Sequence, residues 1–398
     1  MGCTCISTNN TKKTRGRILT NNSEPVIENK KNTKILNPDE KFKKNLNPNS
    51  IIENQTNTTI LKAINQINGD AIRISNNKNC IIIIMDASSS VIIQDCKKCS
   101  IFIAPCSSSI LMRNSKQINL ISISQQLRIT NVNESNLFIF SMTSPAIENC
   151  SDIKLGMFCV QFVELSEMLK NSKINIWENH WSQFHIFGHE NNISFADENT
   201  KKEVIDMFLP GFNNNCYVNF DQYQFIPYTF GRAVQLKNYY NILLIFKSED
   251  ASEDEIIKFL NPDDLKENEC KCICTKVIKF KSNEFNQVCE LVNNANNKNL
   301  YNFLIKRNVN RKKSLINGFD NKDFDMISIN DKVGNINNLE KDDLLFIWFG
   351  YDSDDLSIFI DYLGGIFEEG YYALITNKDV ILDENTFLHK LMKLYEME

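Results

Sequence analysis

The sequence lacks three features that would assign it to common classes of protein. It has no excess of positive charge, because its 398 residues carry a net charge of -5 and have a pI near 5.6. This balance argues against general nucleic-acid binding, which needs a basic surface. No apolar stretch approaches the roughly 18 residues needed to cross a bilayer. Residues 1–30 are polar and contain no apolar core of a secretory signal.

The 13 cysteines lack the paired spacing of a zinc finger. They are scattered, and several lie in strand-like runs, as expected of reduced thiols in a cytosolic protein. Cys96 and Cys99 have a metal-like spacing, but no second pair follows at a finger-like distance. Cys270, Cys272 and Cys274 alternate along a predicted strand. We interpret both groups as structural thiols, with a metal site as the alternative.

What the sequence does contain is a repeat between Ile74 and Gly156. Short apolar runs end in Asn or Asp at positions 76, 95, 114, 131 and 149, so the gaps are 19, 19, 17 and 18. A second β-branched run lies inside each gap. A period of about 18 residues is too short for a helical repeat and is typical of a parallel β-solenoid, in which each coil buries its inward side chains against its neighbours. We expect the Asn and Asp residues to stack at the corners, where side-chain amides satisfy one another.

The N-terminal segment, residues 1–58, is predicted to be an acylated, flexible, Asn-rich tether. Gly2 could accept a myristoyl group, and palmitoylation of Cys3 and Cys5 would add the second lipid that stable anchoring needs. Ile6 departs from the usual Ser or Thr of that motif, and the alternative is an ordinary start with two unmodified cysteines. The segment from about residue 9 has too few apolar residues to order itself. Basic residues that would favour an anionic inner leaflet are Lys12, Lys13, Arg15 and Arg17.

Two tryptophans and three histidines lie close together after the repeat, between Trp177 and His189. They could suggest a metal site, but no Cys, Asp or Glu completes a ligand set at a standard spacing. We therefore predict an aromatic cap on the open end of the solenoid, which must protect its last coil. The solenoid with its cap is predicted to span residues 59–195, and residues 196–238 to form an edge segment and linker.

From residue 239 the 18-residue repeat is replaced by alternating strand-like and helix-like segments. Strands are predicted at residues 240–247, 270–280, 343–350 and 371–377, and helices at residues 253–260, 284–305, 354–367 and 384–396. This β-α-β, β-α-β order predicts a ferredoxin-like α/β sandwich over residues 239–398.

The strand around Arg128 contains a candidate functional site. Alternation sends Gln126, Arg128 and Thr130 outward if the apolar residues between them point inward. Aligning the coils by their closing Asn places Glu148 beside Thr130, and therefore diagonal to Arg128 and within reach of it. A guanidinium held by a carboxylate on a rigid sheet could stabilise charge on a transferring phosphoryl group. The alternative is an exposed ion pair worth less than about 1 kcal/mol.

These residues resemble the tubulin-cofactor-C-domain proteins, and among them a GTPase-activating protein for an Arf-like small GTPase. The matching stretches are Gly2-Cys3, the signature Gln125-Gln126-Leu127-Arg128, and residues 145–148, 152–156 and 176–181. The resemblance spans nearly the whole chain. It implies a right-handed parallel β-solenoid followed by a degenerate nucleoside-diphosphate-kinase-like domain.

The resemblance also implies a role for each matching residue. Arg128 would be an arginine finger directed at the γ-phosphate of the GTP-bound GTPase, Gln126 would contact the partner's nucleotide site, and Glu148 would hold the finger. Gln125 and Trp177 would contact the partner. GTP and magnesium would belong to the partner GTPase, so the chain itself would need no cofactor.

The function expected from these observations is GTPase activation in trans by a lipid-anchored protein at the cytoplasmic face of the plasma membrane or the base of a cilium or flagellum. A second hypothesis is a non-catalytic adaptor that binds a GTP-bound GTPase or tubulin, and a third is a purely structural solenoid. No autonomous reaction is expected. The only histidine after His189 is His389, which lacks the neighbours of a kinase phosphohistidine.

Overall fold

The computed structural model describes residues 47–188, 191–212, 218–220, 225–235, 239–247, 257, 271–279, 301–303, 344–352 and 371–377. The chain divides into two units, residues 1–44 and 45–398, and every described residue belongs to the second. The predicted acylation sites Gly2, Cys3 and Cys5, and also His389, lie outside the described residues. No helix in the described part of the chain combines the length and the apolar character needed to span a membrane.

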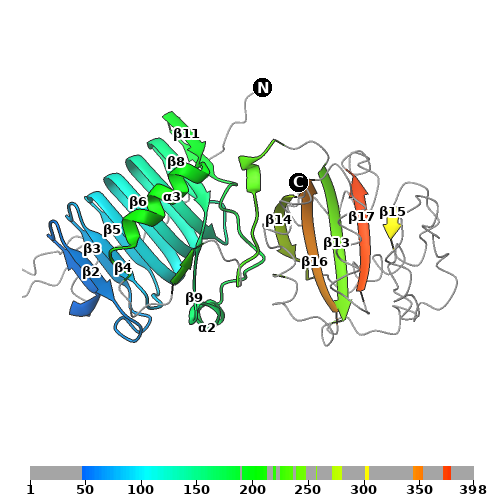
Figure 1. The fold of residues 1–398 in the computed structure, drawn as a ribbon, viewed down its shortest axis with the longest axis horizontal. Helices are drawn as coiled ribbons and strands as arrows, with labels where there is room; N and C mark the ends of the chain where they lie inside the picture. Colours follow the sequence, from blue (N-terminus) through cyan, green and yellow to red (C-terminus); the bar gives the residue numbers. More distant parts are fainter. Residues whose placement is uncertain are drawn as a thin grey trace, which may run out of the picture. The chain divides into compact units, whose positions relative to one another are not determined.

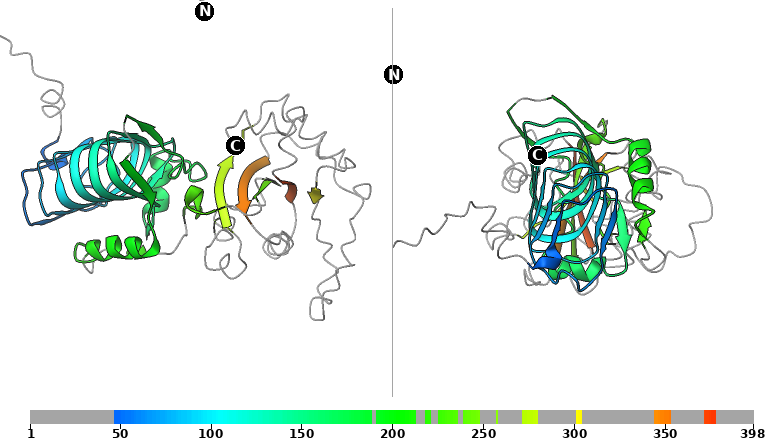
Figure 2. Two further views of the ribbon diagram at one scale, coloured as in Figure 1. Left: turned by 90° about the horizontal axis from the view of Figure 1, so that it is seen from above. Right: turned by 90° about the vertical axis from the view of Figure 1, so that its left-hand side faces the viewer.

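The first part of the second unit winds into a parallel β-solenoid, as the repeat predicts (Figures 1 and 2). Two faces are sheets of parallel strands contributed by successive coils. The first face consists of β1 (Ile51–Glu53), β3 (Ile72–Ser75), β5 (Val91–Gln94), parts of β6 (Lys97–Ser141), β7 (Ala146–Glu148) and β10 (His185–Phe187). The second face consists of β2 (Thr59–Lys62), β4 (Ile81–Ile84), other parts of β6, β8 (Ser151–Met157) and β11 (Asn191–Phe195). The long β6 follows the chain around consecutive coils.

The register of the first face confirms the predicted repeat. Ile74 pairs with Ile93, Ile93 with Met112, and Ile129 with Ile147, and each of these side chains is almost wholly buried. Such a column stabilises the stack, because each fully buried aliphatic side chain contributes about 1.5–3 kcal/mol of hydrophobic free energy.

The solenoid begins earlier than the sequence predicts. Residues up to 58 were expected to belong to the tether, but β1 pairs with β3 and follows a short 3-10 helix, η1 (Pro48–Ser50). The reason is burial of the first apolar run: Ile52 is only 4% exposed in the first coil.

Between the first and the second face the chain turns at two corners, where non-glycine residues adopt the left-handed backbone conformation with φ between 50° and 58°. The first corner is formed by Asn54, Asn76, Asp95, Asn114, Asn131 and Asn149, and the second by Asn57, Asn79, Lys98, Gln117, Glu134, Asp152 and Asn192. Asn and Asp tolerate this conformation better than other residues with a Cβ. Gly188 continues the first corner with φ +85°, and a Cβ there would clash with Asn149 Oδ1.

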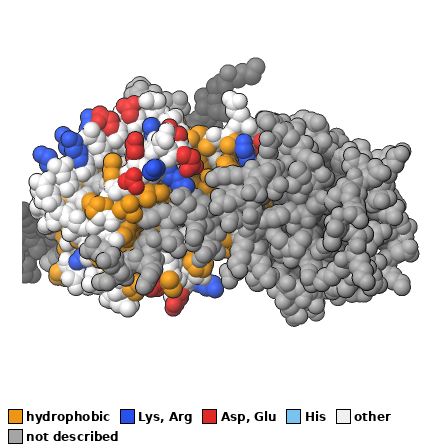
Figure 3. Space-filling view, in the orientation of Figure 1, with side chains coloured by type: hydrophobic (Ala, Val, Ile, Leu, Met, Phe, Trp, Pro, Cys, Tyr) orange, Lys and Arg blue, Asp and Glu red, His pale blue; other side chains and the backbone are white. Residues whose placement is uncertain are grey.

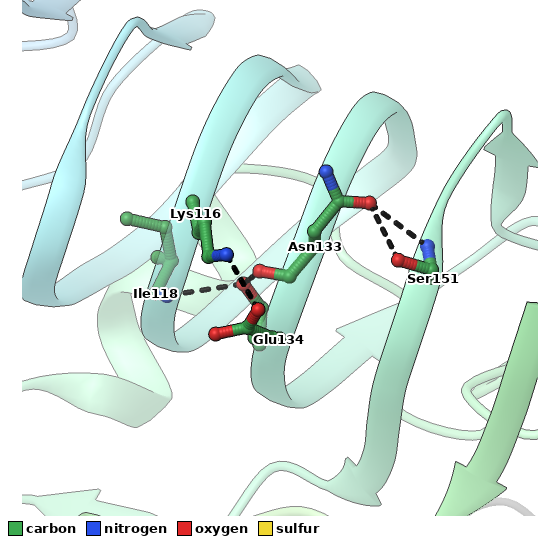
Figure 4. Close-up of polar contacts among 6 residues, drawn as sticks. Lys116, Ile118, Asn133, Glu134 and Ser151 are labelled. Carbon is green, nitrogen blue, oxygen red and sulfur yellow. Dashed lines mark hydrogen bonds and ion pairs between the residues drawn. The ribbon is translucent and has the colours of Figure 1, made fainter.

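The expected amide stacking at the corners is confirmed. Asn131 Nδ2 donates to Asn114 Oδ1 at 3.1 Å, and Asn79 Nδ2 donates to Asn57 Oδ1 at 3.0 Å. Other polar contacts also join neighbouring coils (Figure 4): Asn133 Oδ1 accepts from both the backbone N–H and the hydroxyl of Ser151.

The end of the solenoid carries the aromatic residues predicted to cap it. Trp181 is buried and its ring packs edge-to-face on Phe195 of β11, with centroids 5.6 Å apart. A short helix, α2 (Leu165–Asn171), precedes these residues, and β9 (Val160–Phe162) pairs with β12 (Val218–Phe220).

Residues 196–238 contain more regular structure than the predicted edge segment and linker. They include α3 (Glu198–Phe208) and a 3-10 helix, η2 (Gly231–Ala233). Asp197 caps α3 by accepting from Thr200 N at 2.7 Å, and Figure 1 shows the helix running across the strands of the solenoid. It buries only a narrow set of residues, namely Thr200, Val204, Ile205 and Phe208.

The described C-terminal strands form one antiparallel sheet in the order β14 (Lys271–Val277), β16 (Leu344–Asp352), β13 (Tyr239–Lys247), β17 (Tyr371–Asn377) and β15 (Tyr301–Phe303). All four predicted strands are confirmed. The prediction of a helix at 284–305 is wrong at its end, because β15 pairs with β17 there. The helices expected between the strands lie outside the described residues, apart from residue 257, so the ferredoxin-like assignment stays a prediction.

Candidate functional site

Arg128 and Glu148 lie on neighbouring strands of the first face, as the coil alignment predicts. Thr130 of β6 pairs with Glu148 of β7, so Arg128 is the diagonal neighbour of the carboxylate. Arg128 Nη2 lies 2.8 Å from Glu148 Oε2, and Thr130 Oγ1 donates to the same oxygen at 3.3 Å. Two donors from one strand therefore hold one carboxylate on the next.

The backbone beneath this pair is fixed, while the guanidinium faces solvent. Leu127 and Ile129 are 3% and 1% exposed, so they anchor the strand on both sides of Arg128. The side chain of Arg128 is 61% exposed and that of Glu148 is 33% exposed. A guanidinium has five N–H donors, and within the described structure only Nη2 of Arg128 makes a hydrogen bond. The remaining donors can bind an incoming anion.

The electrostatics of the pair favour the charged state of Glu148. The hydrogen bond from Arg128 is the largest cause and lowers the pKa of this carboxyl. Desolvation opposes it as the next largest effect, and the charge of Arg128 and the Thr130 hydroxyl lower the pKa further. Glu148 is therefore an anion at neutral pH. A charged carboxylate fixes the direction of a guanidinium more strongly than a neutral acceptor does.

A second arginine on the same face, Arg113, contacts a neutral side chain where Arg128 contacts a carboxylate. Arg113 of β6 donates through Nε and Nη2 to the neutral side-chain oxygen of Gln94, at 3.2 and 2.7 Å. Its fork is thus turned toward an amide on the preceding coil. Arg113 provides a natural comparison for Arg128, because both belong to β6 and point outward from the first face.

The two glutamines of the signature precede Arg128 on the same strand. Gln126 is exposed and alternation places it on the outward side with Arg128, and its backbone oxygen accepts from Ser124 Oγ at 3.0 Å. Gln125 is half-buried, and its backbone oxygen accepts from the N–H and the hydroxyl of Thr143. The side chain of Gln126 is therefore the better placed of the two to act beside Arg128.

The expectation that Trp177 contacts a partner is corrected by its burial. The residue is 1% exposed, and its ring packs edge-to-face on Phe349 with centroids 6.3 Å apart. Its backbone oxygen accepts from Thr275 Oγ1 at 3.0 Å. The indole is therefore part of the packing inside the chain and is not presented to another molecule.

Phe187 is the exposed aromatic residue that the sequence did not single out. It lies in β10, pairs with Glu148 in the register of the sheet, and is 52% exposed. The signal was the pattern His185-Ile186-Phe187, in which alternation directs Phe187 outward when Ile186 points inward. Arg128, Glu148 and Phe187 thus lie on three consecutive strands, and Thr130, Glu148 and Phe187 are in register with one another.

One of the histidines considered for metal binding, His180, contacts a glutamine. His180 Nδ1 lies 2.6 Å from Gln183 Oε1. Within the part of the chain that the structure describes, no cluster of three or more His, Cys, Asp or Glu side chains could hold a metal ion, and the cysteines there are free thiols.

Comparisons with known proteins agree with the family identified from the sequence. Residues 69–187 match the family model described as "Tubulin binding cofactor C". The chain is similar to proteins named XRP2. It is 39% identical to that of Danio rerio over 33% of this chain and 35% of the relative. The human protein is 44% identical over 30% of this chain and 34% of the relative, and that of Xenopus laevis 32% identical over 58% and 66%.

The matches cover between about a third and two thirds of the length of these relatives. Among solved structures, Tubulin Binding Cofactor C from Leishmania major aligns with a TM-score of 0.27 at 13% identity, over 38% of this chain and 90% of that one.

Proposed function

Because residues 69–187 form a tubulin binding cofactor C domain and the chain is a relative of the XRP2 proteins, we propose that it is a GTPase-activating protein that supplies Arg128 in trans to an Arf-like small GTPase. The observation that carries this proposal is the exposed guanidinium of Arg128, held at 2.8 Å by Glu148 on a rigid parallel sheet. The reaction class comes from the family resemblance of the Gln125–Arg128 signature.

The chemistry asked of the site is electrostatic. In phosphoryl transfer, charge spreads over the equatorial oxygens of the transferring group, and an arginine that enters from a second protein can accelerate the reaction by about 10³–10⁵. Arg128 is suited to this role because it is permanently charged and most of its N–H donors remain open. Glu148 restricts the rotamers of Arg128 before the partner arrives, so less conformational entropy is lost on docking. GTP and its magnesium ion are bound by the partner in this proposal.

Phe187 extends the proposed docking face by an apolar group next to the charged pair. An exposed aromatic ring beside a charged pair is a common arrangement of a binding hot spot. In this proposal Gln126 and Phe187 contact the partner on either side of Arg128, while Trp177 supports the chain from within.

Membrane attachment through Gly2, Cys3 and Cys5 belongs to the same proposal. It would place the chain on the cytoplasmic face of the plasma membrane, including the base of a cilium or flagellum, where it would control the release of lipidated cargo. The C-terminal sheet is proposed to be a ferredoxin-like, nucleoside-diphosphate-kinase-like domain without kinase activity.

A second candidate is a non-catalytic adaptor for a GTP-bound GTPase or for tubulin. The name of the matching family, tubulin binding cofactor C, favours tubulin as a partner of such an adaptor. The two candidates differ in one respect: an adaptor binds its partner without changing the rate of GTP hydrolysis.

The test is single-turnover GTP hydrolysis by Arf-like GTPases in the presence of the full chain. We expect strong stimulation by the wild-type chain and a loss of about 10³-fold or more with Arg128→Ala. Arg113→Ala is the matched control, because it removes an outward arginine of the same strand, and it should leave the rate unchanged. Binding without stimulation by the wild-type chain would support the adaptor and exclude the arginine finger.

A further inference from the structure

Four lysines lie together where the chain turns from the first face to the second. Lys78, Lys97 and Lys116 occupy equivalent positions on three successive coils. Parallel bridges and backbone hydrogen bonds join these coils: Lys78 pairs with Lys97, and Lys116 N donates to Cys96 O. Lys98 adjoins Lys97 at the second corner, with φ 54°. All four side chains are exposed, and we name this set the lysine ridge.

The ridge is only partly neutralised by its surroundings. Lys116 forms an ion pair with Glu134 of the next coil at 2.5 Å (Figure 4). The side chains of Lys78, Lys97 and Lys98 make no ion pair or hydrogen bond with any residue the structure describes. The carboxylate in the corner segments of these three coils is Asp95, which accepts from Gln94 Nε2 at 3.1 Å.

The charge changes sign along the same corner. The two coils after Lys116 carry Glu134 and Asp152 at the position that Lys98 occupies. In the space-filling view, several Lys and Arg side chains lie at the left end of the solenoid, and others are interspersed with Asp and Glu along the visible face (Figure 3). The whole chain is acidic. The lysine ridge is therefore a local excess of positive charge on a negatively charged protein.

Stacked lysines are an unfavourable arrangement for the chain alone. Adjacent strands of a sheet lie about 4.8 Å apart, and like charges directly opposite one another are destabilising. An anionic partner would attract all of these lysines, so in the complex their charges would contribute favourably to the free energy. The stacking therefore points to a ligand with several negative charges at close spacing.

We propose that the lysine ridge binds the anionic surface of a lipid bilayer. An extended acidic peptide presents same-face carboxylates about 6.8 Å apart, which does not match the rung spacing of about 4.8 Å. Lipid headgroups are laterally mobile and adjust to any spacing, and a convex corner meets a flat surface without needing a pocket. Each lysine held near such a surface strengthens binding about fivefold.

The position of the ridge also determines what remains accessible. Lys116 follows Arg113 of the first face by one corner residue and Ser115, so the ridge adjoins the first face but is not part of it. Glu134 and Asp152 follow on the same corner, so the contact with a bilayer is limited to the coils that carry the lysines. The first face with Arg128 is a different surface and is not the one in contact. This inference does not depend on GTPase activation, since it concerns a different surface.

The test is co-sedimentation of the full chain with vesicles, in a Gly2→Ala background that removes the proposed myristoylation site. Vesicles of phosphatidylcholine with phosphatidylserine are compared with phosphatidylcholine alone. The ridge variant is Lys78→Gln/Lys97→Gln/Lys98→Asn. The matched control is Lys170→Gln/Lys173→Asn/Lys202→Gln, which removes the same charge from exposed lysines and also includes one left-handed position, Lys173.

We expect the ridge variant to lose at least about tenfold in affinity for the anionic vesicles, and the control to lose less than about twofold. Raising the ionic strength from about 0.1 M to about 1 M should remove the difference, because the Debye length falls from about 10 Å to about 3 Å. Thermal unfolding of both variants confirms that they are folded.

Lysine acetylation read by mass spectrometry locates the contact. Vesicles should protect Lys97 and Lys98 and leave Lys170 and Lys202 reactive. Equal losses in the two variants, or protection of the control lysines alone, would overturn the proposal. Binding of soluble polyglutamate through the ridge without binding of vesicles would do the same, and would assign the ridge to an acidic protein.

Discussion

Phe187 pairs with Glu148 on the next strand of the solenoid, and it is 52% exposed. The carboxylate that holds Arg128 therefore has a charged group on one side and an apolar one on the other. A partner that docks on Arg128 would bury Phe187 in the same event.

Replacing Phe187 by Ala should weaken binding of the GTP-bound partner. Truncation of a central aromatic anchor costs about 2 kcal/mol or more, which is roughly a 30-fold rise in Kd. The rate at saturating partner should stay within about twofold, because the ring does not touch the phosphoryl group. Calorimetric titration and single-turnover hydrolysis separate the two effects. Leu209→Ala is the control, since Leu209 is 49% exposed at the C-cap of α3; an equal loss there would contradict a specific role for Phe187.

The Arg128–Glu148 pair should be visible in the titration of the carboxyl group. The pKa of Glu148 is lowered in the folded chain, mainly by the hydrogen bond from Arg128, so the midpoint should lie below the ordinary value of about 4.3. The pair then contributes stability above that ordinary value and loses it as the pH falls through the lowered pKa. In Arg128→Ala the midpoint should rise toward 4.3, as measured by carboxyl NMR. A midpoint unaffected by Arg128→Ala would show that the pair does not persist in solution.

Much of this site follows from two periods in the sequence. The spacing of about 18 residues places Glu148 beside Thr130, and the two-residue alternation of a strand turns Arg128 outward, so neighbours on the first face can be derived by counting. The same counting identifies the corner residues from Asn76 to Asn149. These features depend on local geometry that every coil repeats.

The residues that sequence reasoning misplaced lie where the repeat is interrupted. Between β8 and β10 the chain leaves the coil for α2 and the segment with Trp177, so counting from Glu148 does not reach Phe187. Trp177 and Phe187 are then indistinguishable as aromatic residues near the cap. Burial of Trp177 depends on Phe349 and Thr275, which lie far along the chain. The sequence did not predict helix α3, because the helix has few apolar residues. Those that it buries are Val204, Ile205 and Phe208, together with Thr200.

The corners of the solenoid allow backbone strain and amide stacking to be measured separately. Asn131 has φ 55° and donates Nδ2 to Asn114 Oδ1 at 3.1 Å. Asn136 donates Nδ2 to Asn119 Oδ1 at 2.9 Å and is not among the residues with positive φ. The two positions thus share the amide contact and differ in the backbone.

Asn131→Ala should lower the free energy of unfolding by about 2 kcal/mol, because it loses a hydrogen bond worth about 0.5–1.5 kcal/mol and forces alanine into a conformation that costs about 1–2 kcal/mol. Asn131→Gly removes the same contact and relieves the strain, so its loss should be smaller. Asn136→Ala should be destabilised only by the loss of its hydrogen bond, because its backbone does not have a positive φ. Urea unfolding of the three variants gives the comparison. If Asn131→Ala and Asn136→Ala are equally destabilising, the left-handed corners carry no strain of their own, and stacking alone selects asparagine there.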